Sequence, residues 1–385
     1  MKHIVLLLIA LSLGFTAAVA ADDVVENPAQ PVTGPNAKKI DRTVKMTEVL
    51  RISDIGKDFF LKRPNKIRVA PDGSIFVMDR SQVNILKFSA EGKFITQIVK
   101  KGEGPCELIN LYSYWLGKKG IISSGYMPVK LIEMDFQGKL INEFRVNAHD
   151  YLFTFMGRFK GKYYFYIDPI AGGNGLKVLQ IPLVFSDGKG VITKTGLTFQ
   201  VKRVVHTAKI IRRGTKGNSS TEITMESVDI TRFNYAVTDD GNMYLSTDDR
   251  YLIQQYDFEK DKVVRKFRRQ YTPIPYTPNP KDDFVNSPDF NTLYKWELYT
   301  DVQRLLANGD SLWVITSTVD KTKGILVDVY NTSGKYIDRF YLQIPNLEYP
   351  DDKIMEQLYY YDGFLYGIGM DDEDTPFIVK YKLEE

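Results

Sequence analysis

The sequence predicts an all-β fold, a six-bladed β-propeller, from a pattern of short strands and tight turns that recurs along the chain. Two apolar strands, a tight turn and a further strand follow one another at 74–98, and the same order returns at 242–264. A unit of this kind cannot bury both of its faces alone, so copies of it must stack against one another. A β-sandwich is the alternative architecture, but it does not account for the repeated pairs of turns.

The first twenty residues have the pattern of an export signal. Lys2 and His3 precede an apolar run at 4–19, and Ala18-Val19-Ala20 has the small residues of a cleavage site. We therefore expect cleavage after Ala20 and a periplasmic or secreted protein; an uncleaved membrane anchor is the alternative. No later stretch is long and apolar enough to predict a membrane span in the mature chain.

The composition of the remaining chain divides it into two parts and limits its partners. Residues 21–44 contain three prolines, Gly34 and no aromatic residue, which indicates a flexible linker, and residues 45–385 form the expected propeller domain. Cys106 is the only cysteine, so no intramolecular disulfide can form. Loss of Lys2 with the signal reduces 51 basic residues to 50, against 48 acidic ones. This near-neutral balance gives no reason to expect a nucleic acid as a partner.

Two kinds of tight turn give the number of blades. Six turns precede β-branched or aromatic residues, as expected between the first two strands of a blade; they lie at 71–73, 118–120, 160–162, 239–241, 308–310 and 362–363. Five more turns precede an outer strand, at 90–93, 136–139, 186–189, 259–262 and 332–335. The sixth blade thus lacks an outer strand, and the unassigned strand at 43–50 is expected to supply it and close the ring. Rings of five or seven blades are the alternatives.

Residues 74–108 contain a more specific repeat. Val77–Asp79 and Ile85–Phe88 are strands, and the glycine-rich loop Gly102–Leu108 follows them. Together they resemble the repeat of NHL-type six-bladed propellers, with Cys106 in place of a glycine and Leu108 in place of a phenylalanine. The resemblance extends to exported bacterial propellers of mostly unassigned function. It implies that Asp79 is structural, its carboxylate capping backbone N–H groups of the next loop.

Strand alternation predicts which face of the disc binds a ligand. The tight turns all fall on one face, which we call the short-turn face, and the long connections reach the other, the loop face. Two insertions extend the loop face, at 203–230 and 271–301. The first is basic, which suits either an anion contact or a solvated loop. The second is rich in proline and aromatic residues, which suits either a sugar or peptide contact or a packed lid.

Six residues at these loops are candidates for ligand binding. We expect Arg80, Lys101, Tyr126 and Arg250 to line the central funnel, and Tyr276 and Trp296 to contact a ligand from the lid. The structural alternative for each is an ion pair or a place in the core.

The function predicted from these observations is binding. His-Glu-x-x-His, Gly-x-Ser-x-Gly and Walker motifs are absent from the sequence. We therefore expect an exported, non-catalytic binding or scaffold protein whose ligand is a glycan, a peptide or a protein. The alternative is a Ca²⁺-dependent lactonase-like or lyase-like propeller enzyme, of which Glu103-Gly104-Pro105 is a partial motif. No cofactor is predicted; the acidic run 371–374 suits either Ca²⁺ or a solvated turn, and no metal ligands are assigned.

Overall fold

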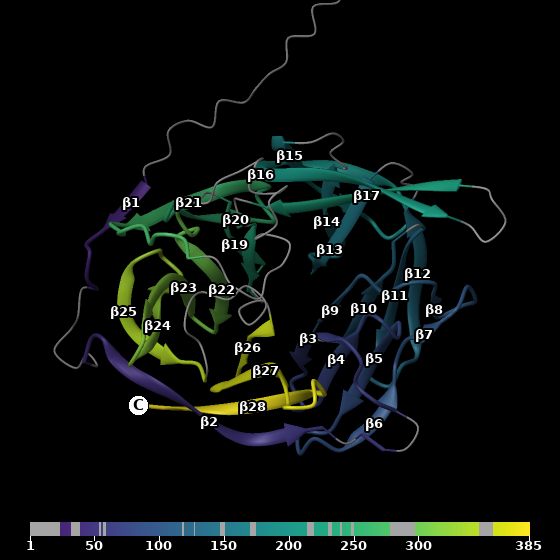
Figure 1. The fold of residues 1–385 in the computed structure, drawn as a ribbon, viewed down its shortest axis with the longest axis horizontal. Helices are drawn as coiled ribbons and strands as arrows, with labels where there is room; N and C mark the ends of the chain where they lie inside the picture. The colour runs from purple at the N-terminus through teal and green to yellow at the C-terminus, as the bar shows by residue number, and fades with distance from the viewer. Residues whose placement is uncertain are drawn as a thin grey trace, which may run out of the picture.

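The structure of the protein, a computed structural model, is a ring of six β-sheet blades (Figure 1). It describes residues 24–31, 39–53, 55–56, 59–117, 119–126, 128–146, 151–169, 175–213, 219–229, 233–238, 241–247, 250–277, 297–345 and 357–385. All 28 elements of this described part are β-strands. No helix in these ranges is long and apolar enough to cross a membrane. The predicted all-β, six-bladed propeller is therefore confirmed.

Each blade is an antiparallel sheet whose strands run in chain order from the ring centre outward. Blade 1 holds β3 (Pro64–Val69), β4 (Ile75–Asp79), β5 (Asn84–Phe88) and β6 (Phe94–Gln97). Blade 2 holds β9 (Ser113–Leu116), β10 (Gly120–Ser124), β11 (Val129–Asp135) and β12 (Leu140–Val146). Blade 3 holds β13 (Tyr151–Phe159), β14 (Lys162–Pro169), β15 (Gly175–Ser186) and β16 (Ile192–Arg213).

The second half of the ring repeats this order. Blade 4 holds β18 (Asn234–Val237), β19 (Asn242–Ser246), β20 (Ile253–Asp257) and β21 (Lys262–Arg269). Blade 5 holds β22 (Val302–Asn308), β23 (Ser311–Asp320), β24 (Gly324–Asn331) and β25 (Tyr336–Gln343). Blade 6 holds β26 (Tyr359–Tyr361), β27 (Phe364–Met370) and β28 (Pro376–Glu384), and its fourth strand is β2 (Arg42–Ile52).

The strand β2 closes the ring. Residues 45–52 pair antiparallel with β28, while residues 42–45 pair parallel with β25 of blade 5 (Figure 1). Val44 packs in the core between blades 5 and 6, and Ile52 packs in the core between blades 6 and 1. The predicted closure by an N-terminal strand is confirmed, and β2 also joins blades 5 and 6 into one eight-stranded sheet.

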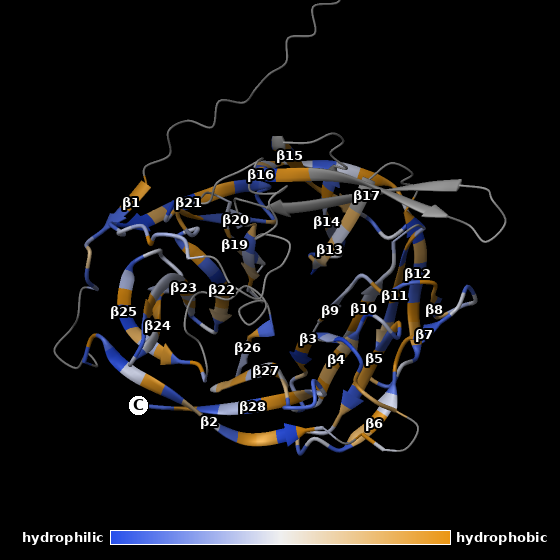
Figure 2. Ribbon diagram, viewed as in Figure 1, coloured by the Kyte–Doolittle hydropathy of each residue, from blue (hydrophilic) through white to orange (hydrophobic). Residues whose placement is uncertain are grey.

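The hydrophobic core lies between the blades. In β4, Phe76 and Met78 pack toward blade 2, and Ile75 and Val77 pack toward blade 6, because alternate residues of a strand point to opposite faces. Six clusters of this kind occupy the six junctions among the described residues. Figure 2 shows the matching hydrophobic residues along the inner and middle strands. A strand buried on both faces is expected to be mainly apolar, as β4 is from Ile75 to Met78.

The expected flexible linker contains a strand, which corrects that expectation for part of its length. β1 (Val24–Asn27) pairs parallel with β21 at the outer edge of blade 4. The Asn27 side chain donates to the carbonyl oxygen of Gly334 at 3.1 Å and accepts from the backbone N–H of Tyr336 at 2.9 Å. An open sheet edge offers unpaired backbone groups, and composition alone does not show that this segment satisfies them.

The insertion at 203–230 is also different from the expected irregular loop. β16 continues to Arg213, and β17 (Ser219–Asp229) returns along it as a fifth strand of blade 3. The β-branched residues at 204–211 favour this continuation. Arg203, one of the basic residues of the insertion, forms a bidentate pair with Asp168 at 3.0 Å.

Cys106, the single cysteine of the sequence, has a backbone conformation that is typical of glycine. Cys106 has φ = 60°, in the left-handed region that glycine adopts without strain. Its backbone N–H donates to the carboxylate of Glu143 on β12 at 2.8 Å. The position therefore requires a positive φ, whichever residue occupies it.

The closing strand gives the first prediction. A mature chain that begins at residue 28 loses only β1, and we expect its thermal midpoint to fall by a few degrees. A chain that begins at residue 53 also loses β2, which exposes two cores and two sheet edges, so we expect no cooperative unfolding transition. Circular dichroism melting of both truncations checks this; equal midpoints would contradict the role assigned to β2.

The backbone at Cys106 gives the second prediction. Cys106→Gly relieves left-handed strain and adds chain entropy, so we expect the free energy of unfolding to stay within about 1 kcal/mol of the parent. Cys106→Val places a β-branched residue at the same φ, and we expect a loss of about 1–3 kcal/mol. Urea denaturation measures both variants. The assignment fails if valine is tolerated as well as glycine.

Candidate functional site

Arg80 and Tyr126, two of the six predicted site residues, come together at the loop face. Arg80 is exposed in the turn after β4, and its guanidinium carbon lies 4.7 Å from the ring centroid of Tyr112 and 6.0 Å from that of Tyr126. The two tyrosine rings meet edge to face at 5.4 Å. Asn110 holds Tyr126 in place, since its side chain bonds both the backbone N–H and the carbonyl oxygen of that residue. We call Arg80, Tyr112 and Tyr126 the Arg80 cluster.

Asp79 holds the turn that presents Arg80. Its buried carboxylate accepts the backbone N–H groups of Ser81 and Gln82, at 3.1 and 3.2 Å, and those of Lys62 and Arg63, at 2.7 and 2.9 Å. Burial alone raises the pKa of this carboxyl group, but the hydrogen bonds, including those from the Ser81 and Gln82 side chains, outweigh burial and lower it. Asp79 therefore braces the turn structurally.

Lys101 lies away from the ring centre, which corrects its expected position in the funnel. It ends β7 (Lys100–Lys101), which pairs with β8 (Glu107–Leu108) at the outer edge of the ring (Figure 1). Lys130 of β11 fixes this loop, because its ammonium group donates to the carbonyl oxygens of Gly104 and Glu107 at 2.8 and 2.9 Å. The connection from an outermost to an innermost strand is thus held against the outside of blade 2.

Arg250 lines a separate cavity at the junction of blades 4 and 5. The cavity has a volume of about 540 Å³, opens among the loop-face connections of these blades, and has β1 as one wall. Arg269 lies at its base and forms a buried pair with Asp328, with the guanidinium Nη2 2.7 Å from the carboxylate. Tyr276 lies in the connection from β21 to β22, which joins blades 4 and 5. The centroid of its ring is 4.9 Å from that of Tyr299. Trp296 lies outside the described residues.

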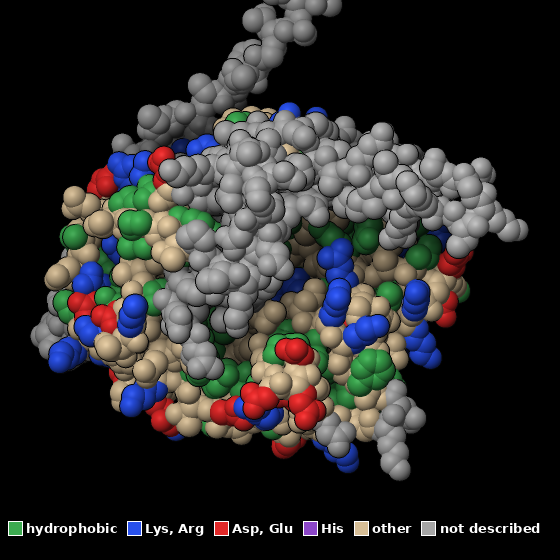
Figure 3. All heavy atoms as spheres, in the orientation of Figure 1, with side chains coloured by type: hydrophobic (Ala, Val, Ile, Leu, Met, Phe, Trp, Pro, Cys, Tyr) green, Lys and Arg blue, Asp and Glu red, His purple; other side chains and the backbone are tan. Residues whose placement is uncertain are grey.

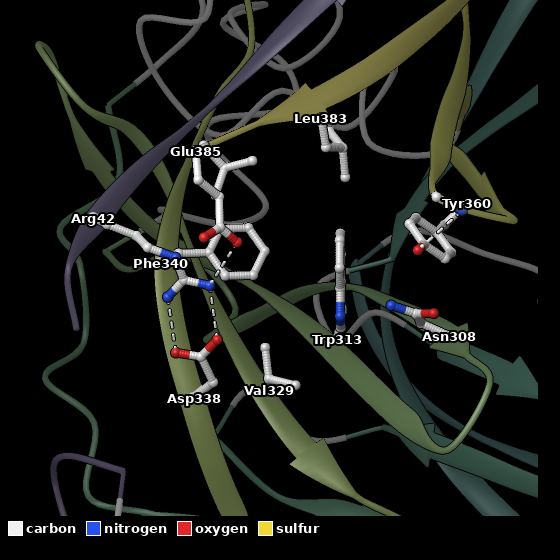
Figure 4. Close-up of a pocket in the computed structure, with 11 residues that line it drawn as sticks. Arg42, Asn308, Trp313, Val329, Asp338, Phe340, Tyr360, Leu383 and Glu385 are labelled. Carbon is white, nitrogen blue, oxygen red and sulfur yellow. Dashed lines mark hydrogen bonds and ion pairs between the residues drawn. The ribbon is translucent and has the colours of Figure 1, made fainter. Parts of the chain in front are cut away.

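A smaller cavity lies beside the closing strand. It has a volume of about 290 Å³ and includes Gly363 from a turn of the short-turn face. Figure 4 shows Arg42 between Asp338 and Glu385 on one side of it, and Trp313 on the other. The larger of these two cavities is thus at the loop face.

The ring centre, the region among the six innermost strands, holds basic residues that sequence reasoning missed. Lys66 and Arg68 lie on β3 of blade 1, and Arg304 lies on β22 of blade 5. All three side chains are half-buried. The charges of Arg68 and Arg304 lower the pKa of Lys66, and both charges also act on the pKa of Tyr235, which lies on β18, the innermost strand of blade 4. On the loop face, Figure 3 shows Lys and Arg side chains gathered beside a central hollow, over β9 and β10.

Burial and like charge set the protonation of the ring centre. Burial is the largest cause that lowers the pKa of Lys66 well below its usual value, and the guanidinium groups of Arg68 and Arg304 lower it further. Burial raises the pKa of Tyr114 and Tyr235, so both phenols stay neutral at physiological pH. The arrangement offers cationic donors and neutral hydroxyl groups in one place.

The described residues hold no group of three or more His, Cys, Asp or Glu side chains arranged for a metal ion. In the acidic run that the sequence related to Ca²⁺, the Asp371 carboxylate accepts the backbone N–H groups of Glu373 and Thr375, at 3.0 and 2.8 Å. These bonds brace the turn between β27 and β28.

Comparisons with known proteins agree with this architecture. Residues 38–211 match the model of the DUF5128 family, described as a 6-bladed beta-propeller. A DUF4221 family member from Bacteroides vulgatus is 9% identical with a TM-score of 0.55, over 90% of this chain and 99% of that one. A putative exported protein from Bacteroides fragilis is 13% identical with a TM-score of 0.51, over 94% of this chain and 100% of that one. No curated protein matches the sequence. The chain thus has the six-bladed propeller fold, and its resemblance to NHL-type repeats stays a prediction.

Proposed function

We propose that this chain is an exported, non-catalytic binding protein that recognises a glycan, peptide or protein ligand with its loop face. The observation that carries the proposal is the Arg80 cluster. An exposed guanidinium group stacks on two tyrosine rings at the loop face, while Asp79 and Asn110 fix the turns that present them. Cation–π pairs that are open to solvent on one side present both charge and aromatic surface to a ligand.

The scaffold supports this role because it is closed and rigid. Six interblade cores and the β2 closure hold the turns of the loop face at fixed positions, so little ordering is required of the Arg80 cluster when a ligand binds. The cavity beside Arg250 provides a second concave surface on the same face. Export rests on the pattern of the first twenty residues and agrees with the description of one similar structure as a putative exported protein.

The third prediction tests the Arg80 cluster. Glycan and peptide arrays identify a ligand, and isothermal titration calorimetry then measures its affinity for Arg80→Ala and Tyr126→Ala. We expect each variant to weaken binding at least tenfold, which is the loss of about 1.4 kcal/mol expected for a desolvated cation–π contact. The melting temperature should change by only a few degrees, since Arg80 is exposed.

Arg51→Ala is the matched control. Arg51 is also an exposed arginine over an aromatic ring, 3.9 Å from the centroid of Phe377, but it lies on β2 at the outer edge of blade 6. We expect it to keep full affinity. Equal losses in the Arg80 and Arg51 variants, or unfolding of Arg80→Ala, would assign Arg80 a structural role and reject the proposed site.

A further inference from the structure

Two cations of the ring centre form no ion pair with any described residue. The ammonium group of Lys66 donates to the hydroxyl oxygen of Ser113 at 3.1 Å and lies 5.5 Å from the ring centroid of Tyr114. The guanidinium group of Arg68 donates to the carbonyl oxygen of Ile67 at 2.7 Å and lies 4.6 Å from the ring centroid of Tyr359. All of these partners are neutral.

Holding Lys66 and Arg68 here without a carboxylate lowers the stability of the ligand-free protein. Half-buried cations close to one another repel, and protein interiors normally supply a carboxylate for each. The same chain does so elsewhere: buried Arg269 has Asp328, and Arg203 has Asp168. Cations held together without such a partner are the arrangement expected where an anion from outside completes the site.

Tyrosine rings lie around these cations, and they indicate which class of ligand the site can bind. Tyr359 and Tyr114 contact the β3 cations, and Tyr235 interacts with Arg68 across the ring. Lys66 donates to Ser113, the residue next to Tyr112 of the Arg80 cluster in the chain. The ring centre therefore adjoins the Arg80 cluster, and its ring faces and hydroxyl groups suit the apolar faces and hydroxyl groups of a saccharide.

We propose that Lys66, Arg68 and Arg304 form an oxyanion site at the ring centre that takes the carboxylate or sulfate group of an acidic saccharide. The inference deepens the proposed function and rests on it, because it names the ligand class of the same face. The oxyanion supplies the counter-charge that Lys66 and Arg68 lack among the described residues, while the tyrosines contact the sugar ring that bears it.

Binding at this site is linked to protonation. The groups that face Lys66 are Ser113, Tyr114, Arg68 and Arg304, and of these only the arginines are charged. A bound anion favours the charged ammonium form and raises the pKa of Lys66 toward its ordinary value. Binding therefore takes up protons between the pKa of Lys66 in the free protein and its higher pKa in the complex, and affinity falls as pH rises across that range.

The fourth prediction uses Lys66→Met, which keeps the length of the side chain and removes its charge. Because the pKa of Lys66 is lowered in the folded state, the unfolded state binds more protons, and stability rises with pH between the folded pKa and 10.5. Removing the group removes this penalty. We expect the ligand-free Lys66→Met protein to melt above the parent at pH 7, so misfolding cannot explain a loss of binding.

The full mature protein, Lys66→Met, Arg68→Met and the control Lys139→Met are titrated with four probes: inorganic sulfate, trigalacturonate, neutral maltotriose and triglutamate. Lys139 is an exposed lysine in a turn of the short-turn face. We expect trigalacturonate and sulfate to bind the parent and the control, and to lose at least tenfold in affinity in the Lys66 and Arg68 variants. Calorimetry in two buffers of different ionisation enthalpy should show proton uptake by the parent that Lys66→Met lacks.

Three results would overturn the inference. Equal affinity of trigalacturonate for the parent and for Lys66→Met would remove the ring centre from the binding site. Stronger binding of triglutamate than of trigalacturonate would assign the site to acidic peptides. Equal losses in the Lys139 control would reduce the effect to net charge. None of these affects the Arg80 test, because a ligand found on the arrays that requires Arg80 but not Lys66 would leave the proposed function standing.

Discussion

The pairing of β2 with both β28 and β25 is the interaction on which the rest of the ring depends. Every other blade obtains its four core strands from one continuous stretch of chain, but blade 6 obtains its outermost strand from the opposite end. Two bidentate pairs secure the start of this strand, Arg42 with Asp338 and Asp41 with Arg339, at 2.6–2.9 Å. Without it, the last blade would present an unpaired edge, and the core at each side of it would lose a wall.

A closed ring also explains how charge is tolerated at its centre. The innermost strands contribute their apolar residues, such as Ile67 and Val69 of β3, to the interblade cores. Alternate residues of a strand point to opposite faces, so Lys66 and Arg68 point away from the core that Ile67 and Val69 occupy. They face the ring centre without weakening that core. The six cores supply the stability, and the centre is left free to hold a strained arrangement of like charges.

Much of the fold could be predicted from the sequence because its signals are local. The turns that define the blades need a positive φ, and Gly73, Gly92 and Gly241 adopt 83°, 85° and 87° there. The strand that closes the ring was predicted from a count of turns. Six turns join the first two strands of a blade but only five precede an outer strand, so one blade lacked its outer strand and the N-terminal strand was unassigned. The strand at 24–27 was missed because its sequence has no strand pattern of its own, and its pairing depends on the open edge of β21.

The candidate site likewise has residues that the sequence predicted and residues whose place only the tertiary structure decided. Sequence position placed Arg80 and Tyr126 at loop starts on one face, and strand alternation by itself brings those loops together. Lys101 was misplaced because the route of its loop is decided by Lys130, a contact with the next blade. For Lys66 and Arg68, the alternation with Ile67 and Val69 predicts only a strand with one polar face. What that polar face meets is decided by the tertiary structure, because Arg304 and Tyr235 reach it only when the ring closes and brings distant strands to one centre.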